Sequence, residues 1–201
     1  MSTTESEQAI AFGEDPAVVE RGLAQQHALT GANAPEAWGD ARAKTVEWWD
    51  PIANAKKGAE LAGIDYLRAM MAGELPPPPI SRLFGFSLVE VADGLAHFAG
   101  VPDESAYNPI GIVHGGTVCT LLDSAIGCAV QTQLPAGVGY TSIDLTVSYL
   151  RPVHATTGAI SAIGTVTKPG RRVAFAEAKV VDSAGKLIAT ATGSCLIMGP
   201  A

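Results

Sequence analysis

The stretch that decides the fold runs from Asn108 to Gln133 and reads NPIGIVHGGTVCTLLDSAIGCAVQTQ. Its second part, residues 115–133, is rich in alanine and leucine and is followed by Pro135-Ala136-Gly137, a combination that ends helices. The pattern predicts a helix over residues 115–133. Apolar side chains cover much of the surface of this helix, so we expect it to be buried on most sides.

Strand patterns lie before and after this helix along the chain. The two before it are joined at Asp93-Gly94, a strong signal for a tight hairpin, and four follow it with short turn sequences between the last three. A parallel sheet needs a helix at each crossover, and only one strong candidate stands among these strands. We therefore expect an α+β fold in which an antiparallel sheet wraps around one long central helix. The expected strands are 84–91, 95–101, 139–150, 158–168, 171–182 and 186–198.

The strand of residues 139–150 carries the clearest alternation. Apolar side chains stand at every second position and polar ones between them, which predicts one packed face and one polar face. The apolar positions are Ile143, Leu145, Val147 and Tyr149, and the polar ones are Ser142, Asp144, Thr146 and Ser148.

The first part of the chain has a different character. We expect one helix from Pro16 to about His27, a short strand over residues 45–49 and a second helix over residues 54–72, which Gly73 ends. Four prolines, residues 76–79, predict a stiff extended connector. The expected organisation is an N-terminal extension, 1–77, that is partly helical, and a domain formed by the sheet and its central helix, 78–201.

Composition and charge restrict the function. The formal net charge is −7 and no long run of Lys and Arg exists, so a nucleic-acid partner is not expected. No apolar run approaches the roughly 20 residues that span a bilayer, and the start, MSTTESEQ, lacks the order of a secretory signal. Cys119, Cys128 and Cys195 show no metal-ligand spacing and are interpreted as reduced thiols. These features predict a cytoplasmic protein with no membrane partner.

A lone carboxylate, Asp123, stands on the otherwise apolar central helix. Burying a carboxylate costs several kcal/mol unless it is paired or functional, so its presence needs a reason. A structural hydrogen-bonded group, a catalytic base or nucleophile, an exposed side chain and a metal ligand are the four alternatives. Metal ligation is poorly supported, since no second carboxylate or histidine lies three or four residues away.

Two glycines at the start of the helix, Gly115 and Gly116, leave backbone N–H groups open at the positive end of the helix dipole. Such donors suit a carbonyl oxygen that gains negative charge. Gly116 and Asp123 are seven residues apart, which is roughly 10 Å along a helix axis. One helix cannot present both groups to the same reacting carbonyl. A catalytic interpretation therefore predicts a homodimer in which antiparallel helices of two subunits share the active sites.

The motif resembles the acyl-CoA thioesterases of the hotdog-fold superfamily, in particular the phenylacetate-pathway (PaaI-like) and 4-hydroxybenzoyl-CoA thioesterase group. The likeness covers about residues 78–198 and rests on N-P-I-G-x-V-H-G-G, with an aspartate nine positions after the histidine, and on the S-I-D-L strand. It implies dimers, often paired again into tetramers. The extension before residue 78 departs from this compact pattern.

The resemblance implies a role for each motif residue. Asp123 would act as general base or nucleophile, and the Gly115 and Gly116 amides would polarise the thioester carbonyl. Asn108 would hold the nucleophilic water or the thioester end. His114 would stand at the helix mouth, with a loop-capping role as its alternative. Ser142 matches a position that orients water beside the carboxylate in some members, although Thr141 is adjacent.

The phosphates of coenzyme A require cations near the mouth of the pocket. Gly170, Arg171 and Arg172 resemble the basic segment of the family, and Arg binds phosphate with a bidentate fork. The alternative is a solvated hairpin tip. Arg151 is a further candidate, with an interface ion pair as its alternative.

The expected reaction is R–CO–S–CoA plus water giving a carboxylic acid and CoA, with no metal and no cofactor beyond the CoA of the substrate. A non-catalytic acyl-CoA or aromatic-ligand binding module is the first rival, and a hotdog dehydratase or hydratase is the second. A binding module would tolerate loss of Asp123. A dehydratase requires a catalytic histidine and an acid at a spacing different from that of His114 and Asp123. Aromatic, medium-chain and branched acyl groups all remain open.

Overall fold

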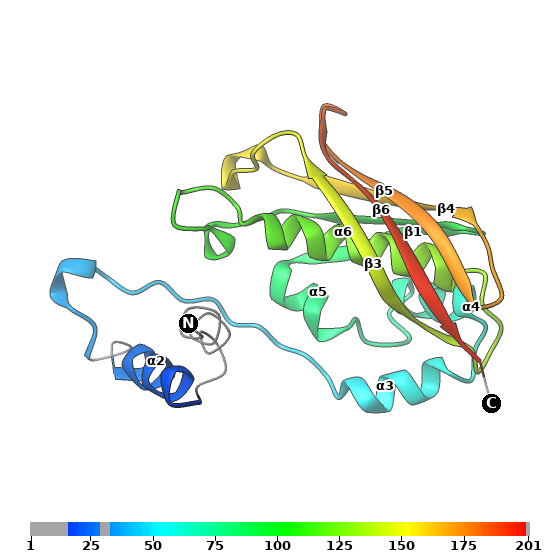
Figure 1. Ribbon diagram of the computed structural model, residues 1–201, viewed down its shortest axis with the longest axis horizontal. Coiled ribbons are helices and arrows are strands. Elements are labelled where there is room, and N and C mark those ends of the chain that lie inside the picture. The colour runs from blue at the N-terminus through cyan, green and yellow to red at the C-terminus, as the bar shows by residue number, and fades with distance from the viewer. Residues whose placement is uncertain (1–15, 29–32, 200–201) are drawn as a thin grey trace, which may run out of the picture. The chain divides into compact units, whose positions relative to one another are not determined.

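The computed structural model describes residues 16–28 and 33–199, and the chain divides into two compact units between Thr45 and Val46 (Figure 1). The first unit contains helix α2 (Pro16–Ala28) and the short 3-10 helix η2 (Glu36–Trp38). The second unit contains every strand and the central helix, so the candidate site belongs to it alone. Among the described residues, no helix is both long and apolar enough to cross a membrane.

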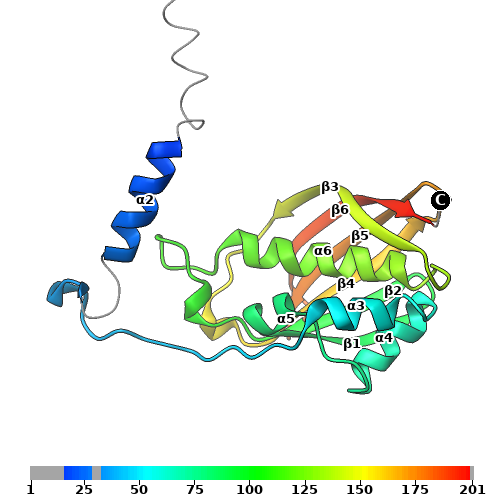
Figure 2. The same ribbon diagram turned by 90° about the horizontal axis from the view of Figure 1, so that it is seen from below.

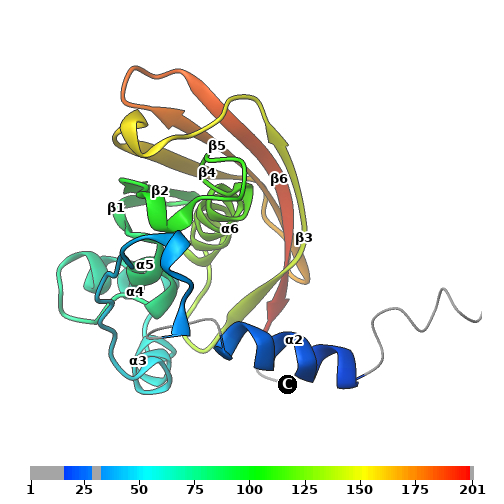
Figure 3. The same cartoon turned by 90° about the vertical axis from the view of Figure 1, so that its left-hand side faces the viewer.

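Six antiparallel strands form one sheet in the order β1-β2-β4-β5-β6-β3. The sheet curves around the central helix, as Figure 3 shows in end view. Strands β1 and β3 form its two edges. The strands are β1 (Phe86–Ala92), β2 (Leu95–Gly100), β3 (Gly139–Tyr149), β4 (Ile160–Lys168), β5 (Val173–Asp182) and β6 (Leu187–Met198). The predicted hotdog arrangement of an antiparallel sheet around one long helix is confirmed.

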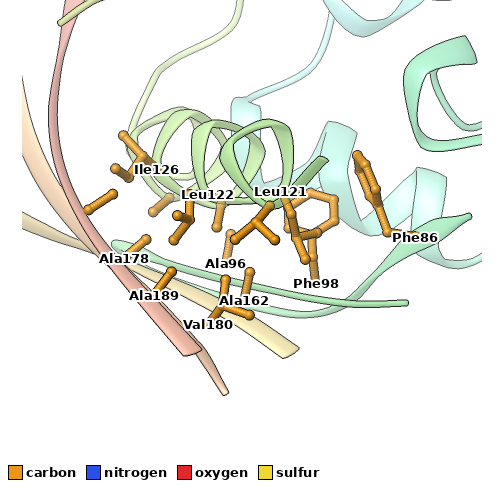
Figure 4. Close-up of a cluster of buried hydrophobic side chains, with 14 of the residues drawn as sticks. Phe86, Ala96, Phe98, Leu121, Leu122, Ile126, Ala162, Ala178, Val180 and Ala189 are labelled. Atoms are coloured by element: carbon orange, nitrogen blue, oxygen red, sulfur yellow. The ribbon is translucent and has the colours of Figure 1, made fainter. Parts of the chain in front are cut away.

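Helix α6 (Gly115–Gln131) lies along the inner face of the sheet (Figure 2). The inward residues of the sheet are mostly alanine and glycine, which lets the helix backbone come close. A Cβ at Gly164 would stand 2.3 Å from the carbonyl oxygen of Ala125, so only glycine fits this crossing. Larger side chains fill the space beside it, with Phe86 and Phe98 in an edge-to-face pair at 5.7 Å between ring centres (Figure 4). The core is therefore narrow under the middle of α6 and wide beside β1 and β2.

The segment before the sheet differs from the prediction in three places. The single helix expected over residues 54–72 is two helices, α3 (Pro51–Gly58) and α4 (Gly63–Met71). Tertiary contact explains the break, because the Gly63 N–H donates to the carbonyl of Leu134 and a Cβ at Gly63 would meet the Gln131 carbonyl at 1.8 Å. The strand expected over residues 45–49 is wrong, since those residues have no regular structure. The last proline of the connector instead opens helix α5 (Pro79–Phe84), as proline does at a first helical position.

The extension and domain boundaries expected from the sequence stay predictions. Helices α3, α4 and α5 belong to the same compact unit as the sheet, and the division by contacts falls at Thr45 rather than at residue 77. Helix α4 contacts β1 and α6, and α5 contacts β1. The stretch from Pro51 to Phe84 therefore contributes to the walls around α6.

Strand β3 departs from simple alternation. Leu145 and Val147 are half-buried between exposed polar neighbours, as predicted, but Ile143 is 54% exposed and Tyr149 is 53% exposed. A β-bulge interrupts the pairing with β6 between Ser142 and Asp144, which leaves Ile143 out of register. Among the described residues β3 pairs only with β6, so its outer edge carries unpaired backbone groups together with exposed apolar side chains.

Candidate active site

The loop before α6 is organised by Asn108. Its side-chain oxygen accepts hydrogen bonds from the N–H groups of Ile110 (3.1 Å) and Ile112 (3.3 Å). Gly111, at φ 78°, turns the chain back and donates its N–H to the Asn108 carbonyl at 3.1 Å. Because the oxygen is occupied inside the loop, the side-chain NH₂ of Asn108 is the group left to donate to a ligand.

His114 is the N-cap of α6. Its Nδ1 accepts the Gly116 N–H at 2.8 Å, and its own backbone N–H donates to the Ala106 carbonyl at 2.7 Å. Since Nδ1 is an acceptor, the neutral ring carries its proton on Nε2. The capping role weighed for His114 is present in the structure. The Gly116 amide is thereby occupied, so Gly115 holds the glycine N–H for which the described residues provide no acceptor.

Tyr149, at the end of β3, packs on this helix start. Its hydroxyl donates to the Gly115 carbonyl at 3.0 Å, and a Cβ at Gly115 would stand 3.1 Å from the tyrosine ring. A side chain at residue 115 would therefore crowd the Tyr149 ring, which would have to shift by a few tenths of an ångström. The alternation of residues in β3 predicts Tyr149 on the packed face of the strand. No pattern in the sequence predicts its hydrogen bond to Gly115.

A cleft of about 270 Å³ opens beside this helix start. It joins the Asn108 loop, the beginning of α6 and the segment after β3. Its lining includes Asn108, Gly115, Val118, Tyr149 and Arg151. Two hydrogen-bond donors, the Asn108 NH₂ and the Gly115 N–H, thus belong to residues of one concave surface whose other walls are largely apolar.

Asp123 lies in the middle of α6 and is half-buried. Ser142 of β3 donates its hydroxyl to Asp123 Oδ1 at 2.7 Å, while no donor among the described residues contacts the other carboxylate oxygen. One oxygen is thus held by a short hydrogen bond and the other is available to a ligand or water. The structure brings Asp123 and Ser142 together, while the expected role of Ser142, to orient water beside the carboxylate, stays a prediction.

Two thiols and a phenol lie close to this pair. Cys195 is fully buried, hydrogen bonds with Ser142, and has its pKa raised by burial. Burial also raises the pKa of Cys128 to about 12, and the Asp123 carboxylate acts in the same direction. The Tyr140 hydroxyl is hydrogen-bonded to Cys128, and burial raises its pKa well above the usual value. These two thiols and the phenol therefore stay protonated and neutral at physiological pH.

The pKa of Cys128 predicts a loss of stability in alkali. An unfolded thiol ionises near pH 9, whereas the folded thiol keeps its proton to about pH 12, so the free energy of unfolding falls as pH rises between these values. At pH 10 the ionisation of this thiol in the unfolded chain should lower the free energy of unfolding by about 1.4 kcal/mol relative to neutral pH. Urea unfolding at pH 8 and pH 10 should therefore show a smaller alkaline loss for Cys128→Ala than for the wild type. An equal fall in the free energy of unfolding in the two proteins would show that the pKa of Cys128 is not raised in the folded state.

The candidate CoA-binding residues form a third group. Arg171 and Arg172 are exposed in the β4–β5 turn, and no carboxylate of the described chain forms an ion pair with either. Gly170 makes this turn possible, because a Cβ there would stand 2.0 Å from the Val173 carbonyl oxygen. Arg151 donates its Nε to the Leu187 carbonyl at 3.1 Å and borders the cleft with Asn108. Arg151 forms no ion pair with a carboxylate of the described chain, and its roles in CoA binding or in an interface ion pair stay predictions.

The site residues therefore occupy separate places in one subunit. Asn108, Gly115 and Arg151 line the cleft at the start of α6, Asp123 and Ser142 stand farther along the helix, and the arginine turn joins β4 to β5. Seven residues of α6 separate Gly116 from Asp123, which is roughly 10 Å along the axis. Among the described residues, no three His, Cys, Asp or Glu side chains gather as metal ligands.

The sheet wrapped around α6, with a glycine-opened helix start and a carboxylate on the same helix, defines a hotdog-fold protein. Residues 110–189 match the family described as the thioesterase superfamily. These residues therefore form a domain of the thioesterase superfamily, and structural neighbours of the chain are PaaI-like thioesterases. The family and the fold predicted from the sequence are thus confirmed.

Three similar proteins illustrate the likeness. A protein of Ralstonia eutropha JMP134, described as a candidate thioesterase related to phenylacetic acid degradation, shares 29% identity at a TM-score of 0.60, over 65% of this chain and 98% of that one. A mutant of the phenylacetic acid degradation protein PaaI from Thermus thermophilus shares 29% identity at a TM-score of 0.54, over 59% and 98% of the two chains.

The third is a curated protein of Halobacterium salinarum whose name describes it, provisionally, as an esterase. It is 45% identical over 76 residues, which make up 37% of this chain and 48% of that protein. The match thus spans about half the length of this relative. Membership of the thioesterase superfamily agrees with the enzyme class predicted from the sequence.

Proposed function

We propose that the protein hydrolyses acyl-CoA thioesters with Asp123 as the catalytic carboxylate. The observation that carries the proposal is the half-buried Asp123 on α6, with one oxygen held by Ser142 at 2.7 Å and the other oxygen open. In a chain of the thioesterase superfamily, this carboxylate is the ionisable group best placed to activate water or to attack a carbonyl.

Two groups of residues act in the proposed reaction, the hydrogen-bond donors at the start of α6 and the carboxylate in its middle. The Asn108 NH₂ and the Gly115 N–H polarise the thioester carbonyl and stabilise the oxyanion. Asp123 removes a proton from water as the oxygen attacks the carbonyl carbon, the C–S bond then breaks, and the proton returns to the CoA thiolate. Attack by the carboxylate itself, through an anhydride that water opens, gives the same products. A single turnover in ¹⁸O water would place the label in Asp123 where water opens the anhydride at the carboxyl carbon of Asp123, and in the released acid where Asp123 acts as a general base.

In this proposal two subunits of a homodimer share each active site, which brings the two groups of site residues together. The homodimer is either the whole assembly or one half of a tetramer. The edge of β3 is long, unpaired in the single chain, and carries the exposed Ile143 and Tyr149. Exposed edges of this kind invite pairing with another chain. Antiparallel pairing of two β3 strands would bring the α6 helices of two subunits alongside each other. Asp123 of one subunit would then face Asn108 and Gly115 of the other, which removes the separation of roughly 10 Å within one helix.

The arginine turn is the proposed binding place for the phosphates of CoA. Arg171 and Arg172 are exposed and carry no partner carboxylate in the described chain, so both are available to a phosphate. Arg151 stands at the cleft and contributes a further positive charge there.

The direct test is release of free thiol from a panel of acyl-CoA esters with short, medium, long and aromatic acyl groups. Turnover of any of them at a rate proportional to protein concentration supports the proposal. Binding of CoA esters without release of thiol from any of them would overturn it and leave a binding module on the same fold.

Ser142→Ala should lower kcat without abolishing activity. A hydrogen bond to a charged group contributes about 1.5–3 kcal/mol, so loss of the bond to Asp123 predicts a fall in kcat of roughly 10- to 100-fold. The matched control is Ser148→Ala, which removes an exposed serine of the same strand that does not contact Asp123. Equal kinetics of the two variants would show that Ser142 does not position the carboxylate.

A further inference from the structure

A second cavity, of about 220 Å³, lies on the side of α6 where α4 and α5 meet the first two strands. Met70 and Met71 come from α4, Leu88 and Phe98 from β1 and β2, and Cys128 from α6. Ser81 also borders it, but its hydroxyl is already bonded to the Pro78 carbonyl at 2.8 Å. No charged side chain of the described chain lines this cavity.

Cys128 connects this cavity to the catalytic carboxylate. It follows Asp123 by five residues on α6, which is roughly 7.5 Å along the axis. The negative charge of Asp123 contributes to the raised pKa of the Cys128 thiol. The burial that raises the pKa of Cys128 to about 12 keeps the thiol neutral, so the wall nearest Asp123 is weakly polar. An acyl chain that extends from Asp123 toward the C-terminal end of α6 would reach the level of Cys128, a lining residue of this uncharged cavity, after roughly 7.5 Å.

We propose that this cavity holds the far end of the acyl group and selects it. The inference rests on the proposed hydrolysis of acyl-CoA thioesters and adds the class of substrate. An apolar cavity of about 150 Å³ binds benzene, so this larger one accepts a group about the size of a substituted benzene ring or a medium-length alkyl chain. The absence of charged lining residues among those described excludes an acyl group with a second carboxylate. An acetyl group is too short to reach Cys128 from Asp123.

The segment that builds the chamber lies outside the part of the chain that matches the family. Met70, Met71, Pro77, Pro78 and Ser81 all precede residue 110, where the family match begins. Methionine side chains adapt their shape to irregular ligands, which suits a selecting wall. In this proposal the helices before the first strand, which lie outside the stretch that the family model matches, set the acyl specificity.

The test uses CoA thioethers, which bind but cannot be hydrolysed. Wild-type protein should bind S-hexyl-CoA at least tenfold more tightly than S-ethyl-CoA, because four additional methylene groups are buried. Ser87 is exposed and borders the cavity, so Ser87→Phe places a large side chain at the rim of the chamber at a position outside the buried core. This variant should bind S-hexyl-CoA about tenfold more weakly and S-ethyl-CoA unchanged.

Val89→Phe is the matched control, since Val89 is exposed on the same strand and does not line the cavity. It should keep the wild-type ratio of affinities. Equal affinity of the two thioethers for wild type, or an unchanged ratio in Ser87→Phe, would overturn the inference. Thiol release from acyl-CoA esters is measured separately. Hydrolysis with no preference in thioether binding would therefore refute the chamber alone, and no hydrolysis of any ester would refute the proposed function.

Discussion

Asp123→Asn should lower kcat for acyl-CoA hydrolysis by about 10³-fold while the affinity for CoA thioethers changes less than about twofold. General base catalysis typically contributes 10²–10⁴-fold, and an amide cannot accept the proton from water. The amide keeps the size of the carboxylate and its oxygen still accepts from Ser142, so the site should remain folded. Thiol release and equilibrium binding measure the two quantities. Asp144→Asn, on the exposed face of β3, is the matched control and should retain wild-type turnover.

The same variant tests whether two subunits share each site. Asp123→Asn and Asn108→Ala, each inactive alone, would be unfolded together and refolded. In a random mixture half of the dimers contain one of each, and one of the two sites in such a dimer is intact, so about a quarter of wild-type activity should return. No recovery from subunits shown to have exchanged would mean that Asp123 and Asn108 act within one chain.

Gly164→Ala should destabilise the protein by about 2–3 kcal/mol, the usual cost of forcing atoms into a packed core. The new Cβ would stand 2.3 Å from the Ala125 carbonyl oxygen, where only backbone can move aside. For a protein of this size the midpoint of thermal unfolding should fall by roughly 5–10 °C. Scanning calorimetry measures the change directly.

Gly139→Ala is the control for that experiment. Gly139 also lies in a strand, but a Cβ there meets the end of the Met198 side chain at 3.7 Å and the Met198 carbonyl oxygen at 4.0 Å, both ordinary contacts. Its stability should stay within about 0.5 kcal/mol of wild type, as is usual for substitutions that touch nothing tightly packed. A similar loss in both variants would mean that glycine removal itself, rather than the close helix–sheet crossing, causes the effect.

The fold was predictable because its signals are local. Turn residues separate the strands, and the one long apolar segment has the length of a helix, so the six strands and α6 were predicted within a few residues. The segment from Thr45 to Phe84 was not, because its breaks depend on distant atoms. Gly63 packs against the Gln131 carbonyl at the point where α4 begins, and no local pattern predicts that contact.

The candidate site was likewise predicted only in part from the sequence. The motif residues are brought to the start and the middle of α6, and the pairing of Ser142 with Asp123 agrees with the prediction. The capping of Gly116 by His114 was weighed only as an alternative, and the contact of Tyr149 with Gly115 was missed. Both depend on how a side chain turns in space, which the order of residues leaves undetermined.

The alanine-rich inner face of the sheet has a consequence for how this protein can change over evolutionary time. Because Gly164 and the buried alanines beside it leave no free volume, mutations there alter stability before they alter chemistry. The α4–α5 wall borders a cavity and includes the adaptable side chains of Met70 and Met71. Natural variation that leads to new substrates is therefore expected to accumulate between Gly63 and Ser87, while the surface that holds α6 stays constant.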